Sequence, residues 1–175
     1  MDIEVIDNFL DKESFKNIQT ILLNTKFPWF LNQVLDDDLS NTQKYNFQFI
    51  HFFYDGINPS IFFEELQPII KKIDPLEIKY IKSNLLIRTH EIIKHGFHVD
   101  IPSSPSNYRT SIFYVNNCDG YTEFEDGTKV FSKENRFITF PTKMKHTGTT
   151  CTNNHIRLVI NFNYTIKGWQ FQYFL

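Results

Sequence analysis

The sequence has 175 residues, of which 41% are hydrophobic and 22% charged, and its formal net charge is −2 at pH 7. This length allows one domain with a substantial hydrophobic core, and we expect residues 1–175 to form that domain. The nearly balanced charge argues against a general nucleic-acid binder, which normally carries a basic excess. No apolar run reaches the length of a membrane span, and the acidic N-terminus lacks the basic start of a signal peptide.

The cysteine and alanine contents bear on the cellular compartment of the protein and on the kind of genome that encodes it. The two cysteines, Cys118 and Cys151, form no CxxC pattern, so we expect a cytoplasmic protein with free thiols. Alanine does not occur in the sequence, although it is the best helix former. Because alanine codons are rich in G and C, this bias indicates a low-GC bacterium or a virus, and a viral protein would act in the host cytoplasm.

Residues 1–77 are predicted to supply helices that support a sheet. After a short strand, Asp11 is a suitable N-cap for a helix whose apolar residues Phe15, Ile18 and Leu22 share one face. Residues 28–44 have weak periodicity and an acidic run, which predicts a long surface loop. Long loops of this kind often serve as lids, so this segment is also a candidate lid.

Two further elements complete this part of the chain. The run YNFQFIHFFYDG predicts a strand that ends in an Asp-Gly turn. The following residues 58–75 have apolar side chains at helical spacing, but Pro68 is expected to split or kink a helix there.

Residues 78–175 show strand patterns throughout. Short apolar runs, among them HGFHVDI and HIRLVINFNYTI, are bounded by Gly, Pro, Asn or Asp. Asp126-Gly127 marks a tight hairpin. Helices followed by many short strands predict a mainly β (α+β) fold, a jelly roll or double-stranded β-helix supported by N-terminal helices.

A group of polar residues in these strands indicates a metal site. His98 and Asp100 are two residues apart, so their side chains share one side of a strand. His146 ends another predicted strand. Two imidazoles and one carboxylate form the facial triad of non-haem Fe(II) oxygenases, which leaves metal positions open for other ligands. A structural zinc site would instead fill its coordination with protein ligands.

Arg157 lies in an otherwise apolar strand, where it shares a face with Val159 and Asn161. A buried guanidinium is unfavourable unless it meets an anion, and a dicarboxylate would give it a bidentate partner. Tyr114, on the strand after the His-x-Asp turn, could donate a further hydrogen bond to that carboxylate.

In this order and spacing, the residues resemble the iron(II)/2-oxoglutarate-dependent dioxygenase family. The segments HVD, YRTSIFYVN, NRFITF and IRLVINFNY resemble its prolyl-hydroxylase-like branch, and residues 120–127 resemble members carried by bacteriophages. The resemblance covers about half of the chain, from residue 78 to residue 164.

The resemblance implies specific roles. His98, Asp100 and His146 would bind Fe(II), and Arg157 would bind the distal carboxylate of 2-oxoglutarate. Tyr114 would assist Arg157. Arg88 stands where that branch often has a tyrosine that contacts the cosubstrate, and His95 stands where it often has a second tyrosine. The family also uses O2, and ascorbate stimulates some members.

The substrate is left open by the sequence. Analogy alone favours peptidyl proline or another protein side chain, while a free amino acid, a small metabolite or a nucleobase remain alternatives. A non-catalytic metal- or sugar-binding cupin-like barrel and a zinc-dependent hydrolase or isomerase are the competing classes. Each of the key residues, taken alone, could be structural: His98 at a sheet rim, Asp100 in a turn, Tyr114 in the core.

Overall fold

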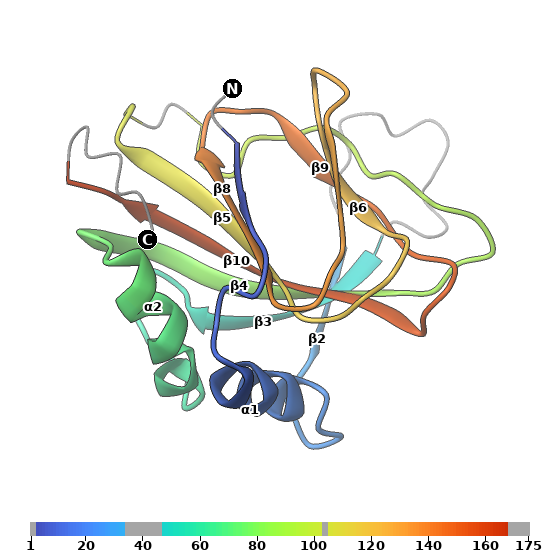
Figure 1. The fold of residues 1–175 in the computed structure, drawn as a ribbon, viewed down its shortest axis with the longest axis horizontal. Coiled ribbons are helices and arrows are strands. Elements are labelled where there is room, and N and C mark those ends of the chain that lie inside the picture. Colours follow the sequence, from blue (N-terminus) through green and yellow to red (C-terminus); the bar gives the residue numbers. More distant parts are fainter. Residues whose placement is uncertain (1–2, 34–46, 103–104, 168–175) are drawn as a thin grey trace.

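The computed structural model describes residues 3–33, 47–102 and 105–167 of the chain. These residues form a large antiparallel sheet with helices on one side and a small antiparallel sheet on the other (Figure 1). None of the helices in the described part of the chain is long and apolar enough to cross a bilayer.

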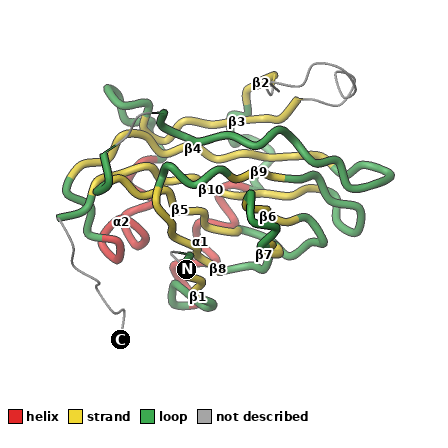
Figure 2. The backbone as a smooth tube through the Cα atoms, turned by 90° about the horizontal axis from the view of Figure 1, so that it is seen from above, coloured by secondary structure: helices red, strands yellow, loops and turns green. Residues whose placement is uncertain are grey.

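The large sheet has the strand order β1-β8-β5-β10-β4-β3-β2. Its strands are β1 (Glu4–Ile6), β2 (Phe30–Gln33), β3 (Phe47–Tyr54), β4 (Glu77–Ile87), β5 (Tyr108–Tyr114), β8 (Arg136–Pro141) and β10 (Ile156–Thr165). The strands β4, β10 and β5 run side by side through its centre, as Figure 2 shows from above. Alternate residues of these strands therefore face the small sheet, and the others face the helices.

The small sheet has the order β7-β6-β9 and comprises β6 (Tyr121–Phe124), β7 (Lys129–Phe131) and β9 (His146–Gly148). The tight turn between β6 and β7 contains Gly127, whose φ of 86° suits a residue without a Cβ. This confirms the predicted Asp126-Gly127 hairpin. A separate apolar cluster, which includes Tyr114, Phe124 and Phe140, fills the space between the two sheets.

The helices cover the opposite face of the large sheet. In α1 (Lys12–Leu22) the Asp11 carboxylate accepts hydrogen bonds from the amides of Glu13 and Ser14, which confirms the predicted N-cap. Phe15, Ile18 and Leu22 are buried in the core between helices and sheet, as their spacing predicted.

The second helical segment is divided at Pro68, as predicted. A short 3-10 turn, η1 (Phe63–Leu66), leads into α2 (Gln67–Ile73), where Pro68 lies in the first turn and needs no amide hydrogen bond. The fold as a whole is the predicted mainly β jelly roll with supporting helices.

Two local expectations differ from the structure. Residues 28–44 were expected to form a loop, but Phe30–Gln33 pairs with β3 as the edge strand β2, and residues 34–46 lie outside the described part. Residues 1–77 thus contribute strands as well as helices. The segment HGFHVDI was expected to form a strand, but it makes only the isolated bridge of His98 with His146, and Lys94, just before it, bridges to Thr149.

Candidate metal and anion site

A cavity of about 350 Å³ opens between the two sheets. Its lining comes mainly from β4, β10, β3 and the edge strand β2, with β9 and the segment around His98 on the other side. The lining residues are Asn32, Gln33, Gln48, Lys82, Asn84, Leu86, His95, His98, Asp100, Ile112, Thr122, His146, Gly148, Arg157, Val159 and Asn161. The predicted ligands and Arg157 therefore share one cavity.

Backbone pairing brings the two candidate histidine ligands together. The amide of His98 donates to the carbonyl of His146 at 3.0 Å, and the amide of His146 donates to the carbonyl of His98 at 3.0 Å. Their ring centroids lie 4.8 Å apart. His146 also packs against the Phe140 ring at 4.8 Å and is buried, while the side chain of His98 is 52% exposed. One imidazole is thus fixed by the core and the other lies at the cavity mouth.

The polar atoms of His98, Asp100 and His146 converge in a way that fits a metal ion. One donor atom from each residue lies within 4.8 Å of the other two. Asp100 Oδ1 is 3.6 Å from His98 Nε2 and 3.9 Å from His146 Nε2, distances that are longer than hydrogen bonds. The three groups therefore face one another without being bonded to one another.

Neighbouring hydrogen bonds orient these ligand atoms. His98 Nδ1 lies 3.2 Å from the carbonyl of Gly96, and His146 Nδ1 lies 3.1 Å from the carbonyl of Met144. A carbonyl can only accept, so each Nδ1 donates and each neutral imidazole keeps a lone pair on Nε2, as a metal ligand requires. Asn163 donates to Asp100 Oδ2 at 2.9 Å, which leaves Oδ1 for the centre of the triad.

The charges of the triad also favour a cation. Burial raises the pKa of Asp100, but its interactions with His98, His146 and Asn163 outweigh this effect and hold the pKa below its usual range. Burial lowers the pKa of His146, which keeps that imidazole neutral. A charged carboxylate beside a neutral imidazole is the protonation state in which both groups can bind a metal.

Arg157 lies deep in the same cavity and is 2% exposed. Its guanidinium donates to Ser132 Oγ at 2.9 Å, to Thr122 Oγ1 at 3.1 Å and to the Thr149 carbonyl at 3.4 Å. All three acceptors are neutral, and no carboxylate among the described residues forms an ion pair with it. Burial lowers the pKa of Arg157, although a guanidinium stays protonated. A buried cation without a protein counterion favours an anionic ligand.

Two glycines make room for this guanidinium. A Cβ on Gly120 would lie 2.6 Å from Arg157 Cδ and 2.6 Å from the carbonyl oxygen of Thr150. A Cβ on Gly148 would lie 3.3 Å from Arg157 Nη1. The sequence alone does not reveal this role of the two glycines, because their contact with Arg157 depends on how the two sheets face each other.

Tyr114 is fully buried, with its ring next to the guanidinium of Arg157. Its hydroxyl donates to Thr122 Oγ1 at 2.8 Å, the same oxygen that accepts from Arg157. The Arg157 guanidinium carbon lies 5.8 Å from the Tyr114 ring centroid. Tyr114 thus contacts the surroundings of Arg157, and a direct contact with a cosubstrate stays a prediction.

Arg88 and His95 differ in their placement. Arg88 is exposed beyond the end of β4, beside Cys151, and does not line the cavity, so the structure does not bring it together with the triad. His95 and His98, three residues apart, would lie on opposite faces of a continuous strand, but both line the cavity because this segment forms isolated bridges instead.

Several cavity residues had no assigned role from sequence. Lys82, Asn84 and Leu86 alternate along β4 and point into the cavity, and Asn163 supports Asp100 from β10. Their alternation is visible in the sequence. The pairing of β4 with β10 decides which face of the alternation meets the cavity.

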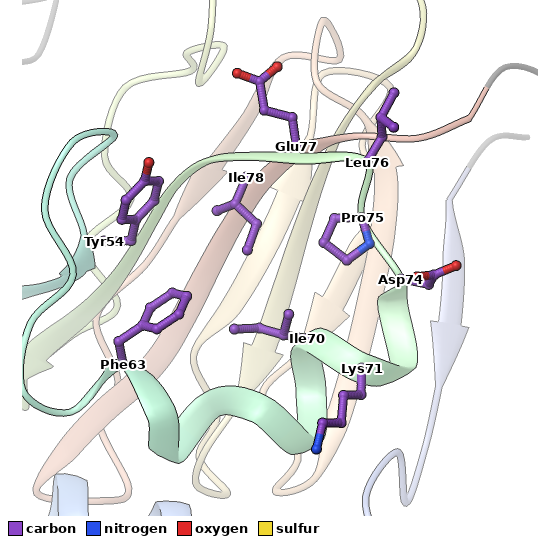
Figure 3. Close-up of a pocket in the computed structure, with 9 residues that line it drawn as sticks. All are labelled: Tyr54, Phe63, Ile70, Lys71, Asp74, Pro75, Leu76, Glu77 and Ile78. Atoms are coloured by element: carbon purple, nitrogen blue, oxygen red, sulfur yellow. The ribbon is translucent and has the colours of Figure 1, made fainter.

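A second pocket, of about 490 Å³, lies between α2 and the start of β4. Phe63 and Ile70 of the helical layer face Ile78 there, with the charged side chains of Lys71 and Glu77 at its rim (Figure 3). Its described lining contains neither histidine nor an arginine. It therefore lacks the donor set that distinguishes the cavity between the sheets.

The fold is shared with solved 2-oxoglutarate-Fe(II) oxygenases. A prolyl hydroxylase from Trichoplax adhaerens, in complex with a hypoxia-inducible-factor peptide, superposes with a TM-score of 0.68 at 15% identity, over 94% of this chain and 83% of that one. A 2OG-Fe(II) oxygenase family oxidoreductase from Burkholderia pseudomallei gives 0.64 at 12% identity, over 94% and 85%. The viral collagen prolyl hydroxylase of Paramecium Bursaria Chlorella virus-1 gives 0.55 at 14% identity, over 95% and 91%.

No protein-family model matches the sequence, and no curated protein matches it in sequence. The similarity is therefore one of fold, and it defines the class of architecture: the jelly roll that 2-oxoglutarate-Fe(II) oxygenases use, prolyl hydroxylases among them. The function must be argued from the cavity itself.

Proposed function

We propose that the protein is an Fe(II)- and 2-oxoglutarate-dependent oxygenase. The observation that carries this proposal is the pairing, in one cavity, of a two-histidine, one-carboxylate cluster with a buried arginine that forms no ion pair with a carboxylate in the described part of the chain. A structural zinc site would not require the buried arginine, and a simple anion-binding site would not require the two histidines and the carboxylate. The shared fold supports the same conclusion.

His98, Asp100 and His146 would hold Fe(II), which supplies the activation of O2. In the overall reaction one oxygen atom enters a C–H bond of the substrate, and the other enters succinate as 2-oxoglutarate loses CO2. Arg157 would bind the distal carboxylate of 2-oxoglutarate through its planar fork, and Thr122 and Ser132 hold that fork in place. Tyr114 would keep Thr122 oriented.

The proposal for the substrate rests on the shape of the cavity and on one similar structure. A peptide or a small molecule fits a cavity that opens at His98, and the Trichoplax adhaerens enzyme was solved with a peptide. Peptidyl proline, another protein side chain and an amino acid are therefore the candidate substrates of the proposed hydroxylase, which we place in the cytoplasm.

Turnover tests this proposal. The Fe(II)-loaded protein is incubated in air with 2-oxoglutarate and proline peptides or free amino acids, and succinate is measured by mass spectrometry. We expect succinate that depends on Fe(II) and 2-oxoglutarate and is lost in Asp100→Ala. A protein that binds Fe(II) tightly but neither binds nor consumes 2-oxoglutarate would support the non-catalytic metal-binding barrel instead.

A further inference from the structure

A second cation lies in the cavity, away from Arg157. Lys82 enters from β4, directly opposite Asn161 of β10, whereas Arg157 lies opposite Leu86. Four residues of strand separate Asn161 from Arg157, which corresponds to about 13 Å. The two basic side chains therefore serve different parts of the cavity. Lys82 lies on the side where Asn163 supports Asp100.

Lys82 is partly buried and has no anionic partner of its own. Its ammonium lies 5.8 Å from the centroid of the Phe52 ring, and among the described residues it forms no hydrogen bond or ion pair. The charge of Asp100 acts on it, but Asp100 is one of the proposed iron ligands. When a bound cation neutralises Asp100, the positive charge of Lys82 faces the cavity with no negative charge to balance it.

Two buried amides accompany this lysine. Asn84 and Asn161 are each 8% exposed and line the cavity. Among the described residues, neither Asn84 Oδ1 nor Asn161 Oδ1 has a hydrogen-bond partner. Buried side-chain amides are nearly always hydrogen-bonded, and an amide oxygen only accepts, so these two oxygens indicate a ligand that also carries a donor such as an N–H group. The Nδ2 group of Asn161 is the part of that side chain that can donate to an anion. Asn161, as the cross-strand neighbour of Lys82, is placed to share a ligand with it.

An apolar surface adjoins the same position. Phe52 pairs directly with Lys82 across β3 and β4 and is 41% exposed. Its ring meets that of Tyr80 edge to face, with centroids 6.4 Å apart. The apolar part of a ligand that binds Lys82 would therefore contact the rings of Phe52 and Tyr80.

We propose that the Lys82 ammonium and the Nδ2 amide of Asn161 donate to a carboxylate of the substrate, and that Phe52 and Tyr80 contact its apolar part. This inference rests on the proposed function, because it reserves Arg157 for 2-oxoglutarate and Asp100 for iron. A cavity of about 350 Å³ must hold the cosubstrate and the reacting part of the substrate together, which favours a small molecule. The substrate class is thus a small carboxylic acid with an apolar portion, such as an amino-acid derivative, rather than an internal residue of a protein.

Binding of matched acids and amides tests this assignment. The full chain is saturated with Fe(II) and 2-oxoglutarate without oxygen, and isothermal titration calorimetry measures binding of two pairs: N-acetylproline with N-acetylprolinamide, and 3-phenylpropanoate with 3-phenylpropanamide. N-acetylprolinamide mimics a proline inside a peptide. We expect at least one acid to bind about ten-fold or more tightly than its amide, a difference that a single charge-assisted hydrogen bond can supply.

The variants identify the lysine responsible. Lys82→Met should reduce the acid-to-amide ratio to less than about two-fold, and Lys82→Arg should largely retain it. Lys79→Met is the matched control, since Lys79 lies on the same strand and pairs with Glu77 at 2.7 Å rather than lining the cavity. It should leave the ratio unchanged.

Several results would overturn the assignment. These are equal binding of acid and amide, tighter binding of N-acetylprolinamide, no binding of either member of both pairs, or an unchanged ratio in Lys82→Met. Titrating 2-oxoglutarate into the Fe(II)-loaded parent and variant proteins distinguishes failure of this assignment from failure of the proposed function. If Lys82→Met weakens 2-oxoglutarate binding, Lys82 serves the cosubstrate and the inference is wrong. If the parent protein does not bind 2-oxoglutarate at all, the proposed function itself fails.

Discussion

Replacing Arg157 separates its effect on ligand binding from its effect on stability. In the bound state a carboxylate would accept two charge-assisted hydrogen bonds from the guanidinium, each contributing about 1.5–3 kcal/mol. Arg157→Met should therefore weaken 2-oxoglutarate binding by about 3–6 kcal/mol, or roughly 10² to 10⁴-fold. Arg157→Lys keeps the charge but loses the planar fork. Its affinity for 2-oxoglutarate should therefore lie between those of the parent protein and of Arg157→Met.

The same substitution should not destabilise the fold. Arg157 is 2% exposed and its hydrogen-bond partners among the described residues are neutral, so no carboxylate there compensates this buried cation. A buried charge that is replaced by an apolar side chain of similar volume often leaves stability unchanged or raised. We expect Arg157→Met to unfold at the parent temperature or above it, although it binds 2-oxoglutarate much more weakly than the parent protein.

Anaerobic isothermal titration calorimetry and thermal unfolding measure these two quantities. Arg109→Met serves as a control, because Arg109 lies on β5 and does not line the cavity. An Arg157→Met protein that binds 2-oxoglutarate with the parent affinity would refute the role assigned to Arg157. A variant that loses affinity only because it unfolds would refute the reasoning about its burial.

Four other perturbations test separate parts of the account. His146→Ala should abolish Fe(II) retention during anaerobic dialysis, measured by elemental analysis; full retention would show that His146 is not a ligand. Gly120→Ala places a Cβ 2.6 Å from Arg157 Cδ and from the Thr150 carbonyl, so it should weaken 2-oxoglutarate binding at least about ten-fold without removing iron. Arg88→Met should change that affinity by less than about two-fold, because Arg88 is exposed outside the cavity; a larger loss would restore its predicted cosubstrate contact. Asp7 binds Arg136 and Lys133, which lower its pKa from 3.8 to about 2. Because the folded pKa is depressed, this stabilisation is present above pH 3.8 and is lost as the pH falls toward 2. Asp7→Asn should therefore remove about 0.5–1 kcal/mol at neutral pH, the amount typical of a partly exposed ion pair, and flatten the acid limb of a urea-unfolding series; an unchanged acid limb would contradict it.

The sequence predicted those features that local chemistry determines. The N-cap at Asp11, the division at Pro68 and the turn at Asp126-Gly127 each follow from one or two residues and their backbone preferences. The succession of helices and many short strands predicted the jelly roll. The shared face of Arg157, Val159 and Asn161 also followed from alternation, and all three line the cavity.

Features that depend on distant pairing were missed or misplaced. Phe30–Gln33 becomes a strand only because β3 lies beside it, and its own sequence has weak periodicity. His95 reaches the cavity because the segment around His98 bridges to β9 at single points, which no spacing rule describes. The role proposed for Lys82 depends on its register with Asn161, which only the pairing of β4 with β10 reveals. The single-domain organisation of residues 1–175 and the candidate lid in residues 28–44 stay predictions.

The roles of the candidate site residues likewise depend on experiment. The structure brings His98, Asp100, His146 and Arg157 into one cavity and leaves Arg88 outside it. The sequence could propose this group because its residue types and order are distinctive. It could not show that the described partners of Arg157 are neutral, which is the observation that most favours an anionic cosubstrate.

The central claim is that one cavity binds Fe(II) and 2-oxoglutarate together, and anaerobic absorption spectroscopy tests it most directly. Fe(II) is added to the purified protein under argon, followed by 2-oxoglutarate, and the visible spectrum is recorded after each addition. The account predicts a visible charge-transfer band that requires both additions, is lost in His146→Ala, and needs far more 2-oxoglutarate in Arg157→Met. Fe(II) binding without any band on addition of 2-oxoglutarate would contradict the account and favour a metal-binding barrel without oxygenase activity.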